Sequence, residues 1–214
     1  MVKLVIFDWD GTLFDSIDKI CGCMLQAAEH AMAPKREFHD IQNIIGLSLD
    51  EGIRVVWPEL PVDALDKIKM HYKRLYVQAD QSPPLAYDGM FELLEQLKGQ
   101  DVLLAVATGK TRRGLDRIMS LTETGHYFAT TRCADEALSK PHPMMLEQIL
   151  AELNVLPEDA VMVGDTEYGL NMARAAGVTS IGVSYGAHDK KRLASCQPQT
   201  IVDNLYQLAS ILGK

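Results

Sequence analysis

Cysteine is scarce in this sequence of 214 residues, and its few thiols form no recognisable pattern. Cys21, Cys23, Cys133 and Cys196 give neither a metal-binding spacing nor an ordered disulfide framework, and Cys21 and Cys23 would point to different sides of a helix. The sequence therefore indicates neither a structural zinc site nor a disulfide-stapled fold. We expect reduced thiols.

Long apolar runs and an excess of positive charge are also missing. No stretch reaches the ~18 apolar residues of a membrane span. The segment from Met1 to Phe7 is too short and too weakly basic for a signal peptide. With 21 Lys and Arg against 29 Asp and Glu, the net charge of −8 argues against nucleic acid and anionic membranes as partners. We expect a cytoplasmic protein, present as a monomer or homodimer.

The most informative feature is a pair of acids directly after an apolar run. Residues 4–7, Leu-Val-Ile-Phe, are followed by Asp8-Trp9-Asp10-Gly11-Thr12. The apolar run predicts a buried parallel strand whose carboxyl end carries the acids. Because Asp8 and Asp10 repel each other and burial disfavours their charged forms, the pair points to a bound cation or phosphoryl group. The alternative is a simple turn closed by an Asx hydrogen bond.

A helical block follows this first strand. Residues 16–33 place apolar side chains on one helical face, namely Ile17, Ile20, Cys21, Met24, Ala28 and Ala31. Ser48-Leu49-Asp50-Glu51 is a capping box that opens another helix. A further apolar face comprises Leu65, Ile68, Tyr72, Leu75 and Tyr76. No strand pattern interrupts the chain before about residue 80.

The rest of the chain alternates helices with short apolar strands. Strands are expected at residues 3–8, 102–107, 127–131, 160–164 and 179–183. Such alternation predicts right-handed crossovers and a parallel sheet, which is an α/β fold. We expect a core domain of residues 1–14 and 85–214, with residues 15–84 inserted as an all-helical domain.

Polar residues follow two more of these strands, where a parallel sheet binds its ligands. Thr108-Gly109-Lys110 follows residues 102–107 and could hold an anion through a hydroxyl and backbone amides, although Thr108 could also be an N-cap. Lys110, Arg112 and Arg113 favour the anion, because cations in a first helical turn oppose the helix dipole. Asp165 is a third strand-end acid, for which an N-cap is again the alternative.

Lys140 is the remaining candidate. Pro141 follows it and keeps it extended and outside the next helix, so its ammonium group could reach a site crowded with carboxylates. The alternative is a lysine exposed to solvent.

Taken in order, these motifs resemble the haloacid dehalogenase superfamily over nearly the whole chain. The DxDGT element at Asp8, the strand-end Thr108, the Lys140-Pro141 element and Gly164-Asp165 follow the family's order. The place of the helical block is similar to that of one of the family's cap types. The nearest likeness is to phosphoglycolate-phosphatase-like members, which implies a Rossmann-like parallel sheet core with a mobile helical cap.

The resemblance implies a Mg²⁺-dependent phosphatase that acts on a small phosphorylated metabolite, such as phosphoglycolate or a sugar phosphate. Asp8 would be the nucleophile and Asp10 the general acid and base. Thr108 and the amides of Trp9 and Gly109 would hold phosphoryl oxygens, with Lys140 balancing charge. Asp8, the carbonyl of Asp10 and Asp165 would bind Mg²⁺. A phosphosugar mutase of the same family and a non-catalytic phosphate-binding protein remain as alternatives.

The chain departs from the family's pattern at Gly169. Relatives usually carry a further acid at this position, four residues after the position of Asp165. The turn at residues 46–49 resembles a cap loop that relatives insert into the site, and Trp57, Tyr72 and Tyr76 either line its entrance or belong to the cap's core.

Overall fold

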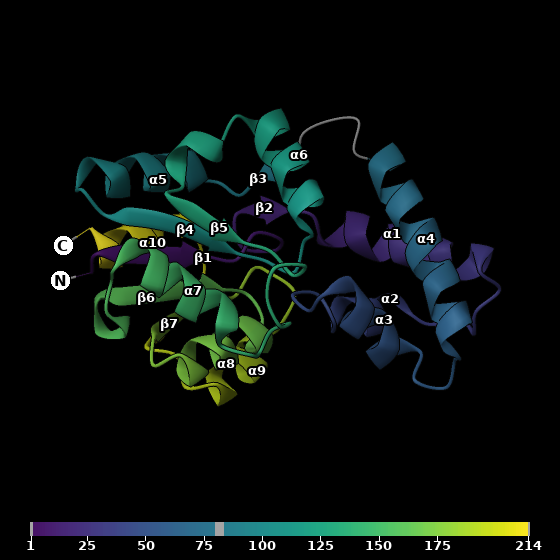
Figure 1. The fold of residues 1–214 in the computed structure, drawn as a ribbon. Helices are drawn as coiled ribbons and strands as arrows, with labels where there is room; N and C mark the ends of the chain where they lie inside the picture. The colour runs from purple at the N-terminus through teal and green to yellow at the C-terminus, as the bar shows by residue number, and fades with distance from the viewer. Residues whose placement is uncertain (1, 80–83, 214) are drawn as a thin grey trace.

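The computed structural model describes residues 2–79 and 84–213 (Figure 1). Residues 80–83, where the expected helical block ends, lie outside the described part, as do Met1 and Lys214. The centre of the fold is a parallel sheet of six strands in the order β5-β4-β1-β6-β7-β8. These strands are β1 (Leu4–Phe7), β4 (Leu103–Ala107), β5 (Thr130–Arg132), β6 (Ala160–Gly164), β7 (Thr179–Val183) and β8 (Thr200–Val202). The α/β class and the parallel sheet are confirmed.

Two details of the sheet differ from the prediction. The strand expected at residues 127–131 is shorter and later, because Gly125–Tyr127 forms a 3-10 helix and β5 begins only at Thr130. Its register is fixed by pairing with β4, where Ala105 lies opposite Thr130. The edge strand β8 was not predicted, since three residues are too few for a periodic pattern.

Alternate residues of β1 enter two separate hydrophobic clusters. Val5 and Phe7 pack on the face covered by α5 (Met90–Gly99), α6 (Arg112–Thr122) and α10 (Leu205–Leu212). Leu4 and Ile6 pack on the face covered by α7 (Met144–Leu153) and α8 (Glu167–Ala175). Figure 1 shows α5 and α6 above the sheet and α7 and α8 below it. The sheet is thus buried on both sides, which explains the uninterrupted apolar strands.

The remaining elements of this part are short. They are the 3-10 helix at Pro157–Asp159 and helix α9 (Lys190–Ser195). Leu193 of α9 packs with Leu170 of α8 in a small cluster at the end of the sheet near β8.

The helical insertion consists of α1 (Ile17–His30), α2 (Phe38–Gln42), α3 (Leu49–Val56) and α4 (Val62–Ala79). It lies to one side of the sheet (Figure 1). Its helices share a hydrophobic cluster in which Met24, Trp57 and Ile68 are buried, and Ala187 of the sheet part joins this cluster. Ser48 caps α3 as predicted, since its hydroxyl accepts a hydrogen bond from the Glu51 amide. The expected helix at 16–33 ends at His30. The helical insertion is confirmed over the described residues 17–79, whereas its limits at residues 15 and 84 stay a prediction.

A small antiparallel ladder lies where the chain leaves and re-enters the sheet part. β2 (Phe14–Asp15) pairs with β3 (Leu85–Ala86), so that Phe14 lies opposite Ala86. The two ends of the helical insertion therefore run side by side.

The four cysteines are buried and form no disulfide bonds. Among the residues described, no helix combines the length and apolar character needed to cross a membrane.

Candidate active site

Asp8 is the first residue after β1, and its carboxylate is buried against Lys140. The Lys140 Nζ atom lies 2.6 Å from Asp8 Oδ2, and the Trp9 amide donates a hydrogen bond of 2.8 Å to Asp8 Oδ1. Burial raises the pKa of Asp8, while the Lys140 charge opposes that rise. Lys140 is itself buried, so the alternative of a solvated lysine is wrong.

Asp165 comes directly after β6, the neighbour of β1 in the sheet. The Thr12 hydroxyl donates to Asp165 Oδ1 at 2.9 Å, and the Ala187 amide donates to Oδ2 at 2.8 Å. Burial and the nearby Asp8 charge raise the pKa of Asp165 to about 7. The N-cap of α8 is Thr166, so the alternative interpretation of Asp165 as a cap is wrong.

Gly11 and Gly186 lie in close contact with the side chain of Asp165. Gly11 has a φ of +72°, and a Cβ atom there would lie 2.1 Å from Asp165 Oδ2. A Cβ atom on Gly186 would lie 2.2 Å from Asp165 Cβ. Both positions therefore require glycine. Gly186 and Ala187 were not predicted from the sequence, although they lie shortly after the end of β7, where a parallel sheet binds its ligands.

Asp10 forms a different set of contacts. Its Oδ1 atom accepts a hydrogen bond of 2.5 Å from the Ser16 hydroxyl and lies 2.9 Å from Lys110 Nζ. Lys110 also donates to the Tyr76 hydroxyl of α4 at 3.2 Å. Burial alone would lower the pKa of Lys110, but Asp10 and Tyr76 raise it overall. Lys110 therefore stays cationic between the acid motif and the helical insertion.

The basic cluster predicted after β4 divides into separate roles. Arg112 forms ion pairs with Asp116 and Glu136, whereas Lys110 pairs with Asp10. Arg113 is exposed at the rim of the cavity described below. Only part of the cluster is therefore available to an anion at the site.

Thr108 and Gly109 lie at the end of β4, beside β1. Thr108 is fully buried, and its hydroxyl accepts a hydrogen bond from the Lys110 amide at 3.2 Å. The N-cap of α6 is Thr111, so Thr108 is not the cap. A Cβ atom on Gly109 would lie 2.4 Å from the Leu47 carbonyl oxygen, which means that the insertion's loop rests directly on this glycine.

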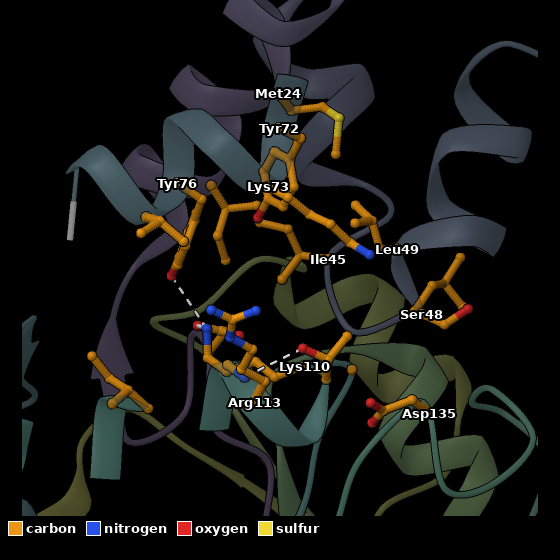
Figure 2. A pocket seen from close by; sticks show the side chains of 18 of the residues that line it. Met24, Ile45, Ser48, Leu49, Tyr72, Lys73, Tyr76, Lys110, Arg113 and Asp135 are labelled. Atoms are coloured by element: carbon orange, nitrogen blue, oxygen red, sulfur yellow. Dashed lines mark hydrogen bonds and ion pairs between the residues drawn. The ribbon is translucent and has the colours of Figure 1, made fainter. Parts of the chain in front are cut away.

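A cavity of about 970 Å³ lies between the helical insertion and the ends of the strands. Asp8, Asp10 and Gly109 line its core side, while the loop at residues 46–49 lines the other side. Figure 2 shows Met24, Tyr72 and Ile45 on the side of the insertion, opposite Lys110 and Arg113. The expected loop is thus at the site.

The three aromatic residues singled out in the sequence take different places. Tyr72 and Tyr76 line this cavity. Trp57 belongs to the hydrophobic core of the insertion. It is fully buried, and its indole Nε1–H donates a hydrogen bond of 2.8 Å to the Pro34 carbonyl. The two tyrosines lie on α4, one helical turn apart, and their ring centroids are 5.5 Å apart.

Asp8 and Asp165 are the candidate ligands for a divalent cation. Within residues 2–79 and 84–213, no three acidic, cysteine or histidine side chains form a ready cluster. Asp8 and Asp165 are nevertheless two buried carboxylates with raised pKa values, and such oxygen donors suit a hard cation that would compensate their charge. A Cβ atom on Gly169 would lie 3.8 Å from Asp8 Oδ2, so the place of the acid that this chain lacks faces the same site.

The chain is similar to known proteins over nearly its whole length. A sequence profile for haloacid dehalogenase-like hydrolases matches residues 5–183. The probable phosphatase IndB of Dickeya dadantii is 33% identical over 213 residues, which cover 97% of this chain and 92% of that protein. The pyrophosphatase PpaX of Anoxybacillus flavithermus is 25% identical, with 99% and 97% covered.

Solved structures show the same fold. A predicted phosphoglycolate phosphatase from Haemophilus somnus superposes with a TM-score of 0.87 at 25% identity, covering 98% of this chain and 97% of that one. A hydrolase from Pseudomonas syringae gives a TM-score of 0.90 at 19% identity, covering 99% and 98%. By its motifs, its fold and these relatives, the chain belongs to the haloacid dehalogenase-like hydrolases.

Proposed function

We propose that this protein is a phosphatase that hydrolyses phosphomonoesters through a covalent aspartyl-phosphate intermediate, an acyl phosphate, on Asp8. The observation that carries the proposal is the buried contact between Asp8 Oδ2 and Lys140 Nζ at 2.6 Å, at the carboxyl end of the central strand. A carboxylate oriented by a fixed cation, next to a cavity, is suited to nucleophilic attack on phosphorus. The relative named as a probable phosphatase supports the same activity.

The reaction would proceed in two displacements. A carboxylate oxygen of Asp8 attacks phosphorus, the bond from phosphorus to the alcohol oxygen breaks, and Asp10 gives a proton to the departing oxygen. Water then attacks the phosphorus of the aspartyl-phosphate and gives its proton to Asp10. The bond between phosphorus and the Asp8 oxygen breaks, which frees inorganic phosphate and the Asp8 carboxylate. In this reaction the Lys110 ammonium group, which lies 2.9 Å from Asp10 Oδ1, would turn toward the phosphoryl oxygens of the substrate.

The phosphoryl oxygens would be bound by this chain's own donors. Thr108 and the amides of Trp9 and Gly109 would supply hydrogen bonds, and Lys140 would balance the added charge. The Trp9 amide now donates to Asp8, so it would exchange this partner for the substrate.

A Mg²⁺ ion would fit this site, held by the carboxylates of Asp8 and Asp165 and by the backbone carbonyl of Asp10. When bound, it would neutralise part of the charge on the phosphoryl group and on the acids. The raised pKa values of Asp8 and Asp165 support this choice, since both carboxylates gain from a nearby cation.

Residues 15–84 would act as a cap that excludes water during phosphoryl transfer and opens to release the products. Contacts around Asn43 would hold it closed. The Arg192 guanidinium donates to Asn43 Oδ1 at 2.7 Å, and the Tyr168 hydroxyl donates to the Asn43 carbonyl at 3.0 Å.

Pyrophosphate is a second candidate substrate. Several relatives are named pyrophosphatases. Among the described residues, the cavity is lined by three carboxylates and by five cationic side chains, namely Lys73, Arg74, Lys110, Arg113 and Arg117. The excess of cations in the cavity is opposite to the net charge of the chain, which is −8.

A phosphosugar mutase would need the same two acids, Asp8 and Asp10. An isomerisation assay on sugar phosphates tests this alternative.

The proposal is tested with Asp8→Asn, measured for release of phosphate from p-nitrophenyl phosphate with Mg²⁺. The amide lacks the nucleophilic oxygen, so turnover should fall by more than about a thousandfold. Asp88→Asn, an exposed acid in the loop before α5, is the matched control and should retain activity. Turnover by pure Asp8→Asn at the wild-type rate, or no turnover by the wild-type protein on any phosphate ester or pyrophosphate, would exclude the proposed activity.

A further inference from the structure

The helical insertion contributes a group of apolar side chains to the cavity, and Lys73 and Arg74 of α4 line the cavity beside them. These apolar side chains include Ile20, Met24, Ile45, Leu49 and the ring of Tyr72. Figure 2 shows Met24, Tyr72, Ile45 and Leu49 on the insertion's side of the cavity. A substrate whose alcohol part is small and polar would leave this surface in contact with water and would gain nothing from it.

The size of the cavity also argues for a larger alcohol. At about 970 Å³ it lies at the upper end of the ~300–1,000 Å³ typical of pockets for drug-sized ligands. A phosphoryl group bound at Asp8 and Asp10 fills only the core side. The remaining space therefore has room for an aromatic ring or a branched apolar group.

Tyr72 adds one polar contact to this apolar surface. In the described part of the chain, its hydroxyl has no hydrogen-bond partner, whereas the neighbouring Tyr76 is engaged by Lys110. Half-buried phenols normally bind a partner. Burial raises the pKa of Tyr72 well above its ordinary value, so the hydroxyl stays protonated and acts as a donor.

We propose that the cavity selects phosphomonoesters whose alcohol part carries an aromatic or branched apolar group together with a hydrogen-bond acceptor that Tyr72 binds. This inference rests on the proposed phosphatase activity and narrows its substrate class. It departs from the phosphoglycolate or sugar-phosphate class that the sequence resemblance implies.

The test compares kcat/KM for four esters of primary alcohols: phosphoglycolate, glycerol phosphate, phenylethyl phosphate and its ring-methoxy derivative. Phenylethyl phosphate should exceed glycerol phosphate by about tenfold or more, since an apolar group gains from the apolar wall. The methoxy oxygen should add about fivefold through Tyr72.

Two variants separate the contributions. Tyr72→Phe should abolish the methoxy advantage and keep the preference for the phenyl ring, whereas Leu49→Ser should reduce that preference. Tyr206→Phe, which removes an exposed phenol hydroxyl on α10, should change neither. Equal loss on all four esters in Tyr72→Phe would overturn the role of its hydroxyl.

The two levels of the proposal fail differently. If phosphoglycolate or glycerol phosphate is hydrolysed as well as phenylethyl phosphate, the inferred substrate class is wrong while the phosphatase activity stands. If none of the four esters and no p-nitrophenyl phosphate is hydrolysed in an Asp8-dependent way, the proposed function itself fails.

Discussion

A side chain at position 169 would face Asp8: a Cβ atom added to Gly169 would lie 3.8 Å from Asp8 Oδ2. The nearest neighbour of that atom would be Met162 Cε, at 3.5 Å, so a side chain begins there without a clash. The sequence places Gly169 one turn after Asp165. An acidic side chain at position 169 would therefore extend into the site beside Asp8.

Gly169→Asp should increase the apparent affinity for Mg²⁺ by about tenfold, because a further carboxylate supports the cation. In chelator the new acid lies beside the buried Asp8, so the melting temperature should fall, and excess Mg²⁺ should reverse the difference. The measurements are a Mg²⁺ titration of the initial rate and melts in chelator and in metal. Gly169→Asn is the uncharged control, and equal behaviour of both variants would mean that the position acts only on the helix.

The metal-free protein should lose stability as pH rises toward neutrality. The folded-state pKa of Asp165 is about 7, above its ordinary value of 3.8, so the folded protein holds a proton that the unfolded chain has released. Between these values the free energy of unfolding falls with pH, by on the order of a few kcal/mol in total. Melting in chelator over this range should show a smaller fall for Asp165→Asn. Parallel curves for the two proteins would contradict the prediction.

Asp10→Asn should affect substrates according to their leaving groups. An alkyl phosphate needs a proton on its departing oxygen and should slow by about a hundredfold or more, whereas p-nitrophenyl phosphate should slow far less. The measurement is kcat for both substrates at saturating Mg²⁺. Equal losses on the two substrates would indicate a damaged metal site instead of a lost general acid.

Replacing residues 15–84 with a short linker should leave a folded core. The pairing of Phe14 with Ala86 brings the two ends together, and the cluster containing Trp57 and Ile68 lies within the removed segment except for Ala187. The shortened protein should hydrolyse p-nitrophenyl phosphate and discriminate less among metabolites. Circular dichroism and a substrate panel measure both effects, and an unfolded product would show that the insertion and the sheet share one core.

The sequence by itself predicted that polar side chains at three strand ends would lie close together. Asp8, Thr108 and Asp165 follow three strands that are adjacent in one parallel sheet, and the carboxyl ends of such strands share an edge. Their meeting could therefore be inferred from local apolar patterns alone. The same local signals identified α3 through its Ser48 cap and the helical insertion through its periodicity.

Only the tertiary structure decided the partners that these residues take. Lys110 joins Asp10 to Tyr76, Gly186 presses against Asp165, and Tyr72 keeps its hydroxyl without a partner in the described chain. Each of these relationships connects segments that are distant in sequence, so no local pattern encodes it. Side-chain packing between the insertion and the sheet sets these distances and the shape of the cavity, so neither could be inferred from the sequence. The class of reaction could be inferred, because it depends on motifs that are local in the sequence.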